Sequence, residues 1–127
     1  MSSSVEVIEQ WVKANALPVD RAPGSSRVSI SFDTVRAHLQ GLPGNQLLIE
    51  ARVCDLPSSQ SAVERLVEKA LTVSLGRLRD NPSVLTIDDV GSALWLQRRL
   101  AVSVSTERLD SAVEQLVNEV EIWRAVL

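Results

Sequence analysis

The chain has 127 residues, 45% of them hydrophobic, and a formal net charge of −3. This length and composition predict a soluble, globular single domain over 1–127, and the acidic balance argues against nucleic acid as a partner. We find no membrane-spanning apolar run and no signal-peptide pattern, and the single cysteine cannot form an internal disulfide, so we expect a cytoplasmic protein.

The first half of the chain predicts a helix followed by three strands. Ser3 and Glu6 have the spacing of a capping box, and apolar residues recur at helical spacing as far as Ala16. Alternating apolar and polar residues then predict strands over 27–33 and, more weakly, over 34–39. A turn at Pro43-Gly44 leads into a third strand, so 27–55 is expected to form a three-stranded meander.

The second half predicts two more helices and two more strands. A helix is expected over 61–75, with Ser61 and Glu64 as a capping box and Gly76 as its C-cap. A strand over 84–87, a turn over 88–92 and a longer strand from Ala93 follow. A final helix begins at Ser105 or Thr106 and carries an apolar face of Leu109, Val113, Leu116, Val117, Val120 and Trp123.

The resulting order is α-β-β-β-α-β-β-α. Strands joined by short turns pair antiparallel, so the fold class is predicted to be α+β. We expect a twisted antiparallel sheet with helices packed on it.

The helix over 61–75 is apolar on two sides. At 100° per residue its apolar positions spread over roughly 220°, about twice the stripe that one core face requires. Such a helix needs cover from its own sheet and from something else, which in a small domain is often a second copy of the protein. Burial by the chain's own loops is the alternative. The apolar positions are 62, 63, 66, 67, 70, 71, 73 and 75.

The last strand also has two surfaces to cover. Trp95 points to the face opposite Leu94 and Leu96, together with Gln97 and Arg99. Tryptophan is enriched where proteins meet partners, so Trp95 could contact a partner or a second copy. Packing over the edge of a helix is the other interpretation.

The sequence gives little support for a catalytic site. The one possible nucleophile–base pair is Cys54 with His38, and it lacks a charged third group in register and a glycine-rich oxyanion loop. Counting by twos, Cys54 lies opposite the core row of Leu47, Ile49, Ala51 and Val53, and we interpret it as structural. A small cofactor-free enzyme that uses Cys54 and His38 is therefore the weakest hypothesis.

Metal and phosphate sites are not predicted either. The chain has one Cys and one His, without metal-ligand spacing, and the glycines do not follow a phosphate-loop pattern. Asp88 and Asp89 fit a hairpin turn better than a cation site, because further alternating oxygen ligands are missing. We expect no enzyme activity and no cofactor.

Three stretches together resemble the class I type III secretion chaperones of the Tir chaperone type. "NQLLIEARVCDLP" (45–57) is similar to the third strand of that family and ends on its polar-Leu-Pro step. "SALWLQRRLAV" (92–102) is similar to the last strand, and "LDSAVEQLVNEVEIWRAVL" (109–127) to the final helix. The second Arg at 98–99 departs from the family pattern, which usually has a Pro nearby.

The resemblance implies a homodimeric cytoplasmic chaperone from a Gram-negative pathogen. Such a chaperone binds the N-terminal segment of one secreted effector in extended form and keeps it soluble and secretion-competent without ATP. An unrelated α+β protein-interaction adaptor without a secretion role is the alternative.

The resemblance also implies two sets of contact residues. Effector contact is expected on the first helix and first strands, at Val5, Ile8, Val12, Val28, Ile30 and Phe32. The dimer interface is expected on the central helix and last strand, at Leu66, Ala70, Leu71, Val73, Leu75, Trp95 and Gln97.

Overall fold

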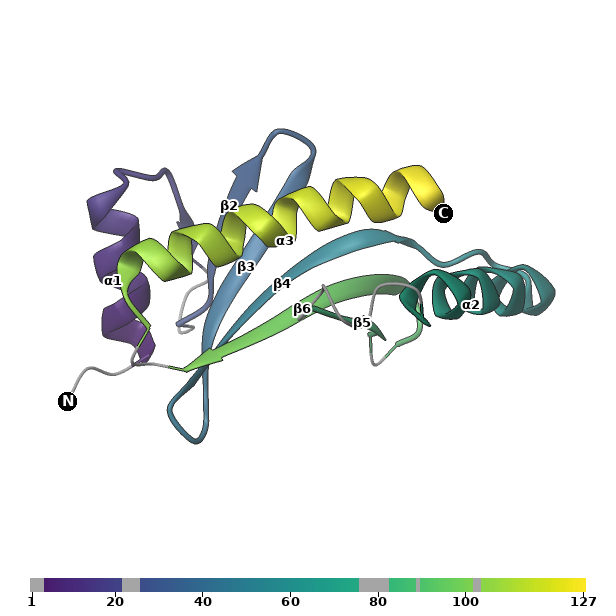
Figure 1. Ribbon diagram of the computed structural model, residues 1–127, viewed down its shortest axis with the longest axis horizontal. Coiled ribbons are helices and arrows are strands. Elements are labelled where there is room, and N and C mark those ends of the chain that lie inside the picture. The colour runs from purple at the N-terminus through teal and green to yellow at the C-terminus, as the bar shows by residue number, and fades with distance from the viewer. Residues whose placement is uncertain (1–3, 22–25, 76–82, 89, 102–103) are drawn as a thin grey trace.

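A computed structural model describes residues 4–21, 26–75, 83–88, 90–101 and 104–127. The protein is an α+β fold with a six-stranded antiparallel sheet in the order β1-β2-β3-β4-β6-β5 (Figure 1). In chain order the elements are α1 (Ser4–Ala14), β1 (Asp20–Arg21), β2 (Val28–Phe32), β3 (Val35–Leu42), β4 (Gln46–Asp55), α2 (Gln60–Leu75), β5 (Val84–Ile87), β6 (Ala93–Ala101) and α3 (Thr106–Val126).

The predicted order of elements is confirmed, with one addition. β1 is a two-residue exposed strand that pairs with β2, and it is too short to produce an alternating pattern. The meander of β2, β3 and β4 is antiparallel throughout, as predicted. Gly44 and Asn45 have positive φ angles of 80° and 58° in the turn between β3 and β4. The predicted features at Ser3, Gly76 and Asp89 lie outside the described residues.

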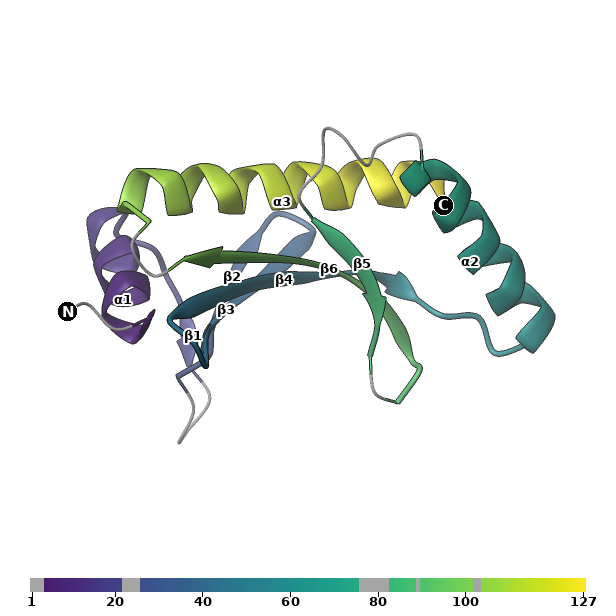
Figure 2. The same ribbon diagram turned by 60° about the horizontal axis from the view of Figure 1, so that its bottom comes forward.

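α1 and α3 cover one face of the sheet, and α3 crosses it at an angle (Figures 1 and 2). The predicted apolar face of α3 is confirmed, since five of its six residues are buried and Val117 packs against the same core. Ser105 is the N-cap, and its hydroxyl accepts a hydrogen bond from the backbone N–H of Arg108 at 3.2 Å.

α1 is fixed between α3 and β3. The Trp11 side chain is fully buried, and its indole N–H donates to Asp110 Oδ1 at 3.1 Å. At its other end α1 lies directly over Gly41 of β3, where a Cβ would come within 2.9 Å of the Ser4 Cβ. The missing side chain at Gly41 therefore permits the close approach of helix and strand.

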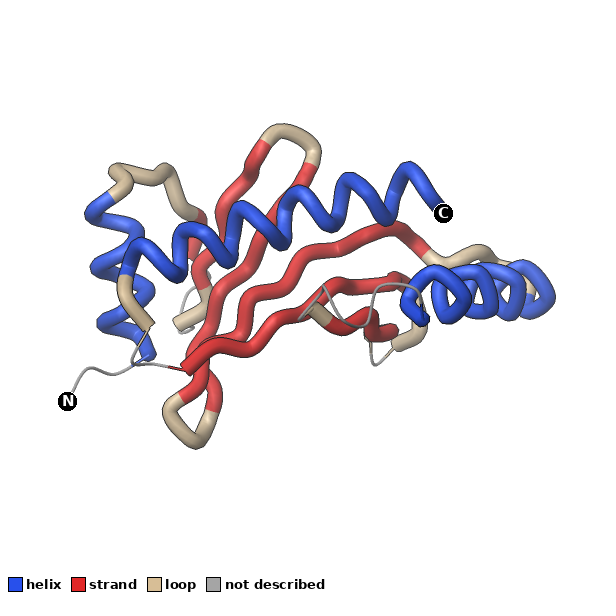
Figure 3. Tube along the Cα trace, viewed as in Figure 1, coloured by secondary structure: helices blue, strands red, loops and turns tan. Residues whose placement is uncertain are grey.

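α2 differs from the other two helices in position. It follows the end of β4 and extends beyond the sheet, where Figure 3 shows it apart from the layer formed by α1 and α3. Among the described elements, the pairs with extended contact do not include α2. The predicted capping box was wrong, because Ser59 is the N-cap instead of Ser61. Its hydroxyl accepts from Ala62 N–H at 3.2 Å, which places Ser61 inside the first turn.

Candidate functional site

The exposed side of α2 is the first candidate interaction surface. Leu71 is 61% exposed, and the neighbouring apolar side chains Ala62, Val63, Leu66 and Val67 are only half-buried. Ala70 reaches the core, at 7% exposure. The helix is thus covered on one side and leaves an apolar margin in solvent, which agrees with the predicted two-sided pattern.

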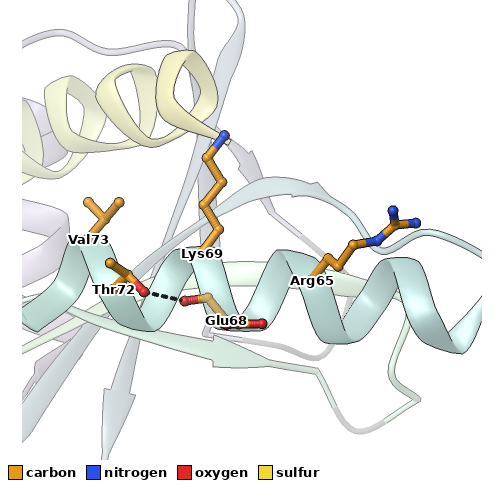
Figure 4. A pocket seen from close by; sticks show the side chains of 5 residues that line it. All are labelled: Arg65, Glu68, Lys69, Thr72 and Val73. Carbon is orange, nitrogen blue, oxygen red and sulfur yellow. Dashed lines mark hydrogen bonds between the residues drawn. The ribbon is translucent and has the colours of Figure 1, made fainter.

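A shallow hollow of about 460 Å³ runs along the same helix (Figure 4). It is lined by Arg65, Glu68, Lys69, Thr72 and Val73, so charges of both signs border the apolar margin. Lys69 extends toward the C-terminal end of α3, and the Thr72 hydroxyl donates to the Glu68 carbonyl oxygen at 2.9 Å. This combination of apolar and mixed-charge groups suits a protein partner better than a small molecule.

The open face of the sheet, opposite α1 and α3, carries a polar network. Glu50 on β4 accepts from Arg27, just before β2, at 2.6 Å and from Gln97 of β6 at 2.7 Å. Arg27 also donates to Gln40 of β3 at 3.0 Å. One ion pair and two glutamine side chains therefore connect β3, β4, β6 and the residue just before β2 across this face.

Trp95 of β6 lies on this open face, next to the edge strand β5. Its ring is 5.7 Å from the His38 ring, tilted by 50°, and the Arg52 guanidinium carbon is 5.8 Å from the indole centroid. Leu94 and Leu96, its neighbours in β6, are buried in the core. The predicted orientation of Trp95 away from the core is confirmed, and its contacts are made with polar side chains, not with the edge of a helix.

His38 is held as a neutral imidazole. Burial, together with the charges of Arg27 and Arg36, lowers its pKa from 6.5 to about 4, while the charge of Glu50 opposes them. The Ser29 hydroxyl lies 2.7 Å from Nδ1. A neutral imidazole at this position completes the polar network and carries no charge into it.

Cys54 is not where the alternation placed it. The register of β4 with β6 shifts between Arg52 and Cys54, so that Cys54 lies opposite Leu94 and packs partly buried against the core. A β-bulge inserts one residue and moves the following side chain to the other face. Burial, followed by the charge of Asp55, raises the pKa of the Cys54 thiol.

The bulge also removes the geometric basis for a Cys54–His38 pair. His38 faces Trp95 on the open side of the sheet, whereas Cys54 packs against the core on the side of α1 and α3. A base on one face of a sheet cannot take a proton from a thiol on the other.

Asp88 serves the predicted hairpin turn. Its carboxylate accepts from the backbone N–H and the hydroxyl of Ser92, both at 2.7 Å, and these bonds lower its pKa. Within the described residues no cluster of three His, Cys, Asp or Glu side chains could hold a metal ion. The helices described are too short or too polar to span a membrane.

The residues expected to contact an effector fall into two groups. Ile8, Val12, Val28 and Ile30 are core residues, at most 9% exposed. Their apolar spacing reflects packing inside this chain, and in this conformation they offer almost no surface to a partner. The other two remain accessible: Val5 is 41% exposed at the start of α1, and Phe32 is partly buried.

The residues expected at a dimer interface lie on α2 and on the open face of β6. Leu66 is half-buried and Leu71 is exposed, whereas Ala70 and Val73 pack against the core of their own chain. The Leu75 side chain lies outside the described part of the structure. Trp95 and Gln97 are half-buried, and both lie on the open face of β6.

One exposed apolar edge was not predicted as a contact surface. β5 is the last strand of the sheet, and Val84 and Ile87 are 63% and 42% exposed there. Val90, in the following turn, is 83% exposed. The signal in the sequence is a short strand, "VLTI", without the charged or proline residues that usually protect an edge.

Lowering the pH is expected to destabilise the protein through His38. The pKa of His38 is about 4 in the folded protein and near its ordinary value of 6.5 in the unfolded chain. Between these two pH values the unfolded chain therefore binds the proton more readily. Stability is therefore lost as the pH falls through this window, by about 1–3 kcal/mol from this residue.

Urea unfolding at several pH values between about 4.5 and 7.5 measures this effect. His38→Asn keeps an acceptor near Ser29 but does not titrate. The difference in the free energy of unfolding between wild type and variant therefore leaves out the contribution of the carboxylates, which the two proteins share. Parallel pH profiles for the two proteins would contradict the assignment.

The comparisons with known proteins give a family and a fold. The sequence model of the Tir chaperone protein (CesT) family matches residues 13–124. A search of curated protein sequences finds no match. Among solved structures, the HopA1–SchA chaperone–effector complex is similar with a TM-score of 0.68 and 14% identity, over 94% of this chain and 91% of that chain.

Two further structures have the same fold. The Yersinia pestis type III secretion chaperone SycH, solved with a fragment of YscM2, has a TM-score of 0.64 and 16% identity, over 95% of this chain and 99% of that one. YbjN from E. coli, a candidate transcription regulator, has a TM-score of 0.67 and 19% identity, over 94% of this chain and 86% of that one. At these identities the structures establish the fold, while the family match covers most of the sequence. The chain belongs to the Tir chaperone protein (CesT) family.

Proposed function

We propose that this protein is a dedicated cytoplasmic chaperone of type III secretion, which works as a homodimer without ATP. It binds the N-terminal segment of one secreted effector in extended form and keeps that effector soluble and competent for export. The observation that carries the proposal is the family match over residues 13–124. The similarity to a chaperone–effector complex and to a type III secretion chaperone supports it.

The geometry supports binding of an extended segment. The sheet has two edges, β1 and β5, and an extended peptide can add a strand to such an edge through backbone hydrogen bonds. Val5 and Phe32 offer apolar surface close to the β1–β2 side of the protein. An effector segment that is disordered when free pays an ordering cost on binding, so contact over several such patches is required.

The homodimer is supported by α2. The chain's own elements leave the apolar margin of α2 in solvent, so its burial by a second copy is favourable. When both copies use the same surface, the contact is isologous and the assembly is complete as a dimer. We therefore place the dimer interface on α2, around Leu71, with the open face of β6 next to it.

Co-expression with a secreted effector tests the function. We expect a stable complex of two chaperones and one effector by light scattering, unchanged by ATP or its removal. An effector that lacks its N-terminal segment is the matched control and should not co-purify. Equal binding of the truncated effector, or a strictly monomeric chaperone at micromolar concentration, would contradict the proposal.

A second function is favoured by the fold comparison. The similarity to YbjN shows that this fold is not restricted to secretion chaperones, so an α+β interaction adaptor without a secretion role is the alternative. Secretion assays on a strain that lacks this gene separate the two. Loss of export of one effector supports the chaperone, whereas unchanged export with loss of another complex supports the adaptor.

A further inference from the structure

The sheet splits at the junction of β3 and β4. Their pairing ends at Ala37 and Ala51, although β3 begins at Val35 and β4 continues to Asp55. β4 pairs with β6 along its whole length, and beyond Ala51 β6 is its one described neighbour, with the bulge between Arg52 and Cys54 in this part. A bulge bends its strand, and Figure 1 shows β4 leaving the β2–β3 hairpin and running on toward α2.

One side chain bridges this split. Arg124 of α3 donates from Nε to the carbonyl oxygen of Val53 at 2.7 Å and from Nη2 to that of Arg52 at 2.9 Å, both on β4. From Nη1 it donates to the carbonyl oxygen of Thr34 at 2.9 Å, next to β3. The guanidinium thus bonds the backbone on both sides of the gap, and its planar fork serves several acceptors at once.

Arg124 is itself firmly placed. It belongs to the last turns of α3, where Val120 and Trp123 are buried in the core at 0% and 3% exposure. α2 begins only a few residues after β4 ends, and Leu56 N–H, within this connection, donates to the Ser92 carbonyl oxygen at 2.9 Å. This short connection couples the direction in which β4 leaves the sheet to the position of α2.

We infer that Arg124 is a positioning residue for the dimer interface: by bonding Thr34 on one side and Arg52 and Val53 on the other, it fixes the direction of β4 and hence the position of α2. This inference rests on the homodimer of the proposed function. Apart from the packing of Ala70 and Val73 against the core, α2 has no extended contact with the other described elements, so the strand that leads into it is a main determinant of its position. An interface built from two copies of α2 requires that position to be the same in every chain.

Distances between spin labels test the inference directly. In a Cys54→Ser background, Gln60→Cys on α2 and Ser111→Cys on α3 place labels at two exposed positions. Labelled protein is diluted into an excess of unlabelled protein, so that distances within one chain are measured. We expect a single narrow distribution for the otherwise unchanged protein and a broader or shifted one for Arg124→Gln.

Arg108→Gln is the matched control, since Arg108 is an exposed arginine of the same helix, and it should leave the distribution unchanged. Arg124→Lys can serve fewer of the three carbonyls and should give an intermediate result, which also keeps the test open if Arg124→Gln does not fold. Sedimentation should show the dimer dissociation constant of Arg124→Gln raised about tenfold, equivalent to 1.4 kcal/mol.

The outcomes are separable from those for the proposed function. If Arg124 variants lose stability but keep both the distance distribution and the dimer affinity, Arg124 is a stabilising residue and the inference is wrong. If the unsubstituted protein is a monomer, the proposed homodimer is wrong, and the inference about its interface is wrong with it. The distances then report only whether Arg124 fixes α2 within one chain.

Discussion

Leu71→Asp is expected to convert the dimer into a folded monomer. Leu71 is 61% exposed in the single chain, so an aspartate there remains hydrated and the fold of the monomer is preserved. In the dimer the same carboxylate would be buried without a partner, at a cost of about 3–5 kcal/mol. The dissociation constant should therefore rise by about a hundredfold or more, measured by sedimentation or light scattering.

Two further variants make this result specific. Ile122→Asp introduces the same charge at an exposed apolar position of α3, where Ile122 is 41% exposed, and should leave the dimer intact. Val73→Asp is less informative, because Val73 packs against the core of its own chain and the variant would also destabilise the monomer. A Leu71→Asp protein that remains a dimer of normal affinity would show that the interface lies elsewhere.

The periodicity of apolar residues was sufficient to predict most of the fold. β5 has the predicted bounds, and the cap at Ser105 follows from a serine just before a helical apolar stripe. The bulge in β4 could not be predicted, because alternation assumes a period of two and the residues around Cys54 include no glycine to mark an irregularity. One inserted residue was enough to place Cys54 on the wrong face.

The contact surfaces were harder to predict than the fold, for a physical reason. Ile8 and Leu71 are both apolar residues on amphipathic helices, yet one is 1% and the other 61% exposed. The difference depends on whether another element of the same chain covers that side of the helix, which is a property of the tertiary structure. The pattern on α2 was informative only because it was too wide for one core face.

Replacing Trp11 with alanine is expected to be among the most destabilising single changes in the chain. The side chain is fully buried between α1 and α3, so its removal leaves a large cavity and should cost about 3–5 kcal/mol in urea unfolding. Trp11→Phe keeps most of the side-chain volume and removes the hydrogen bond to Asp110. The free energy of unfolding should therefore fall by a smaller amount, about 1 kcal/mol for the hydrogen bond and a further loss from the smaller ring.

The contrast between Trp11 and Val5 separates the fold of α1 from its proposed contact with an effector. Val5 is 41% exposed on the same helix, so Val5→Ala should change stability by less than about 0.5 kcal/mol while it weakens effector binding. Trp11→Phe should lower stability and leave effector binding unchanged, because the helix remains in place with its exposed residues unchanged. If both variants lower stability and binding in proportion, effector affinity reflects the stability of α1, and Val5 is not a contact residue.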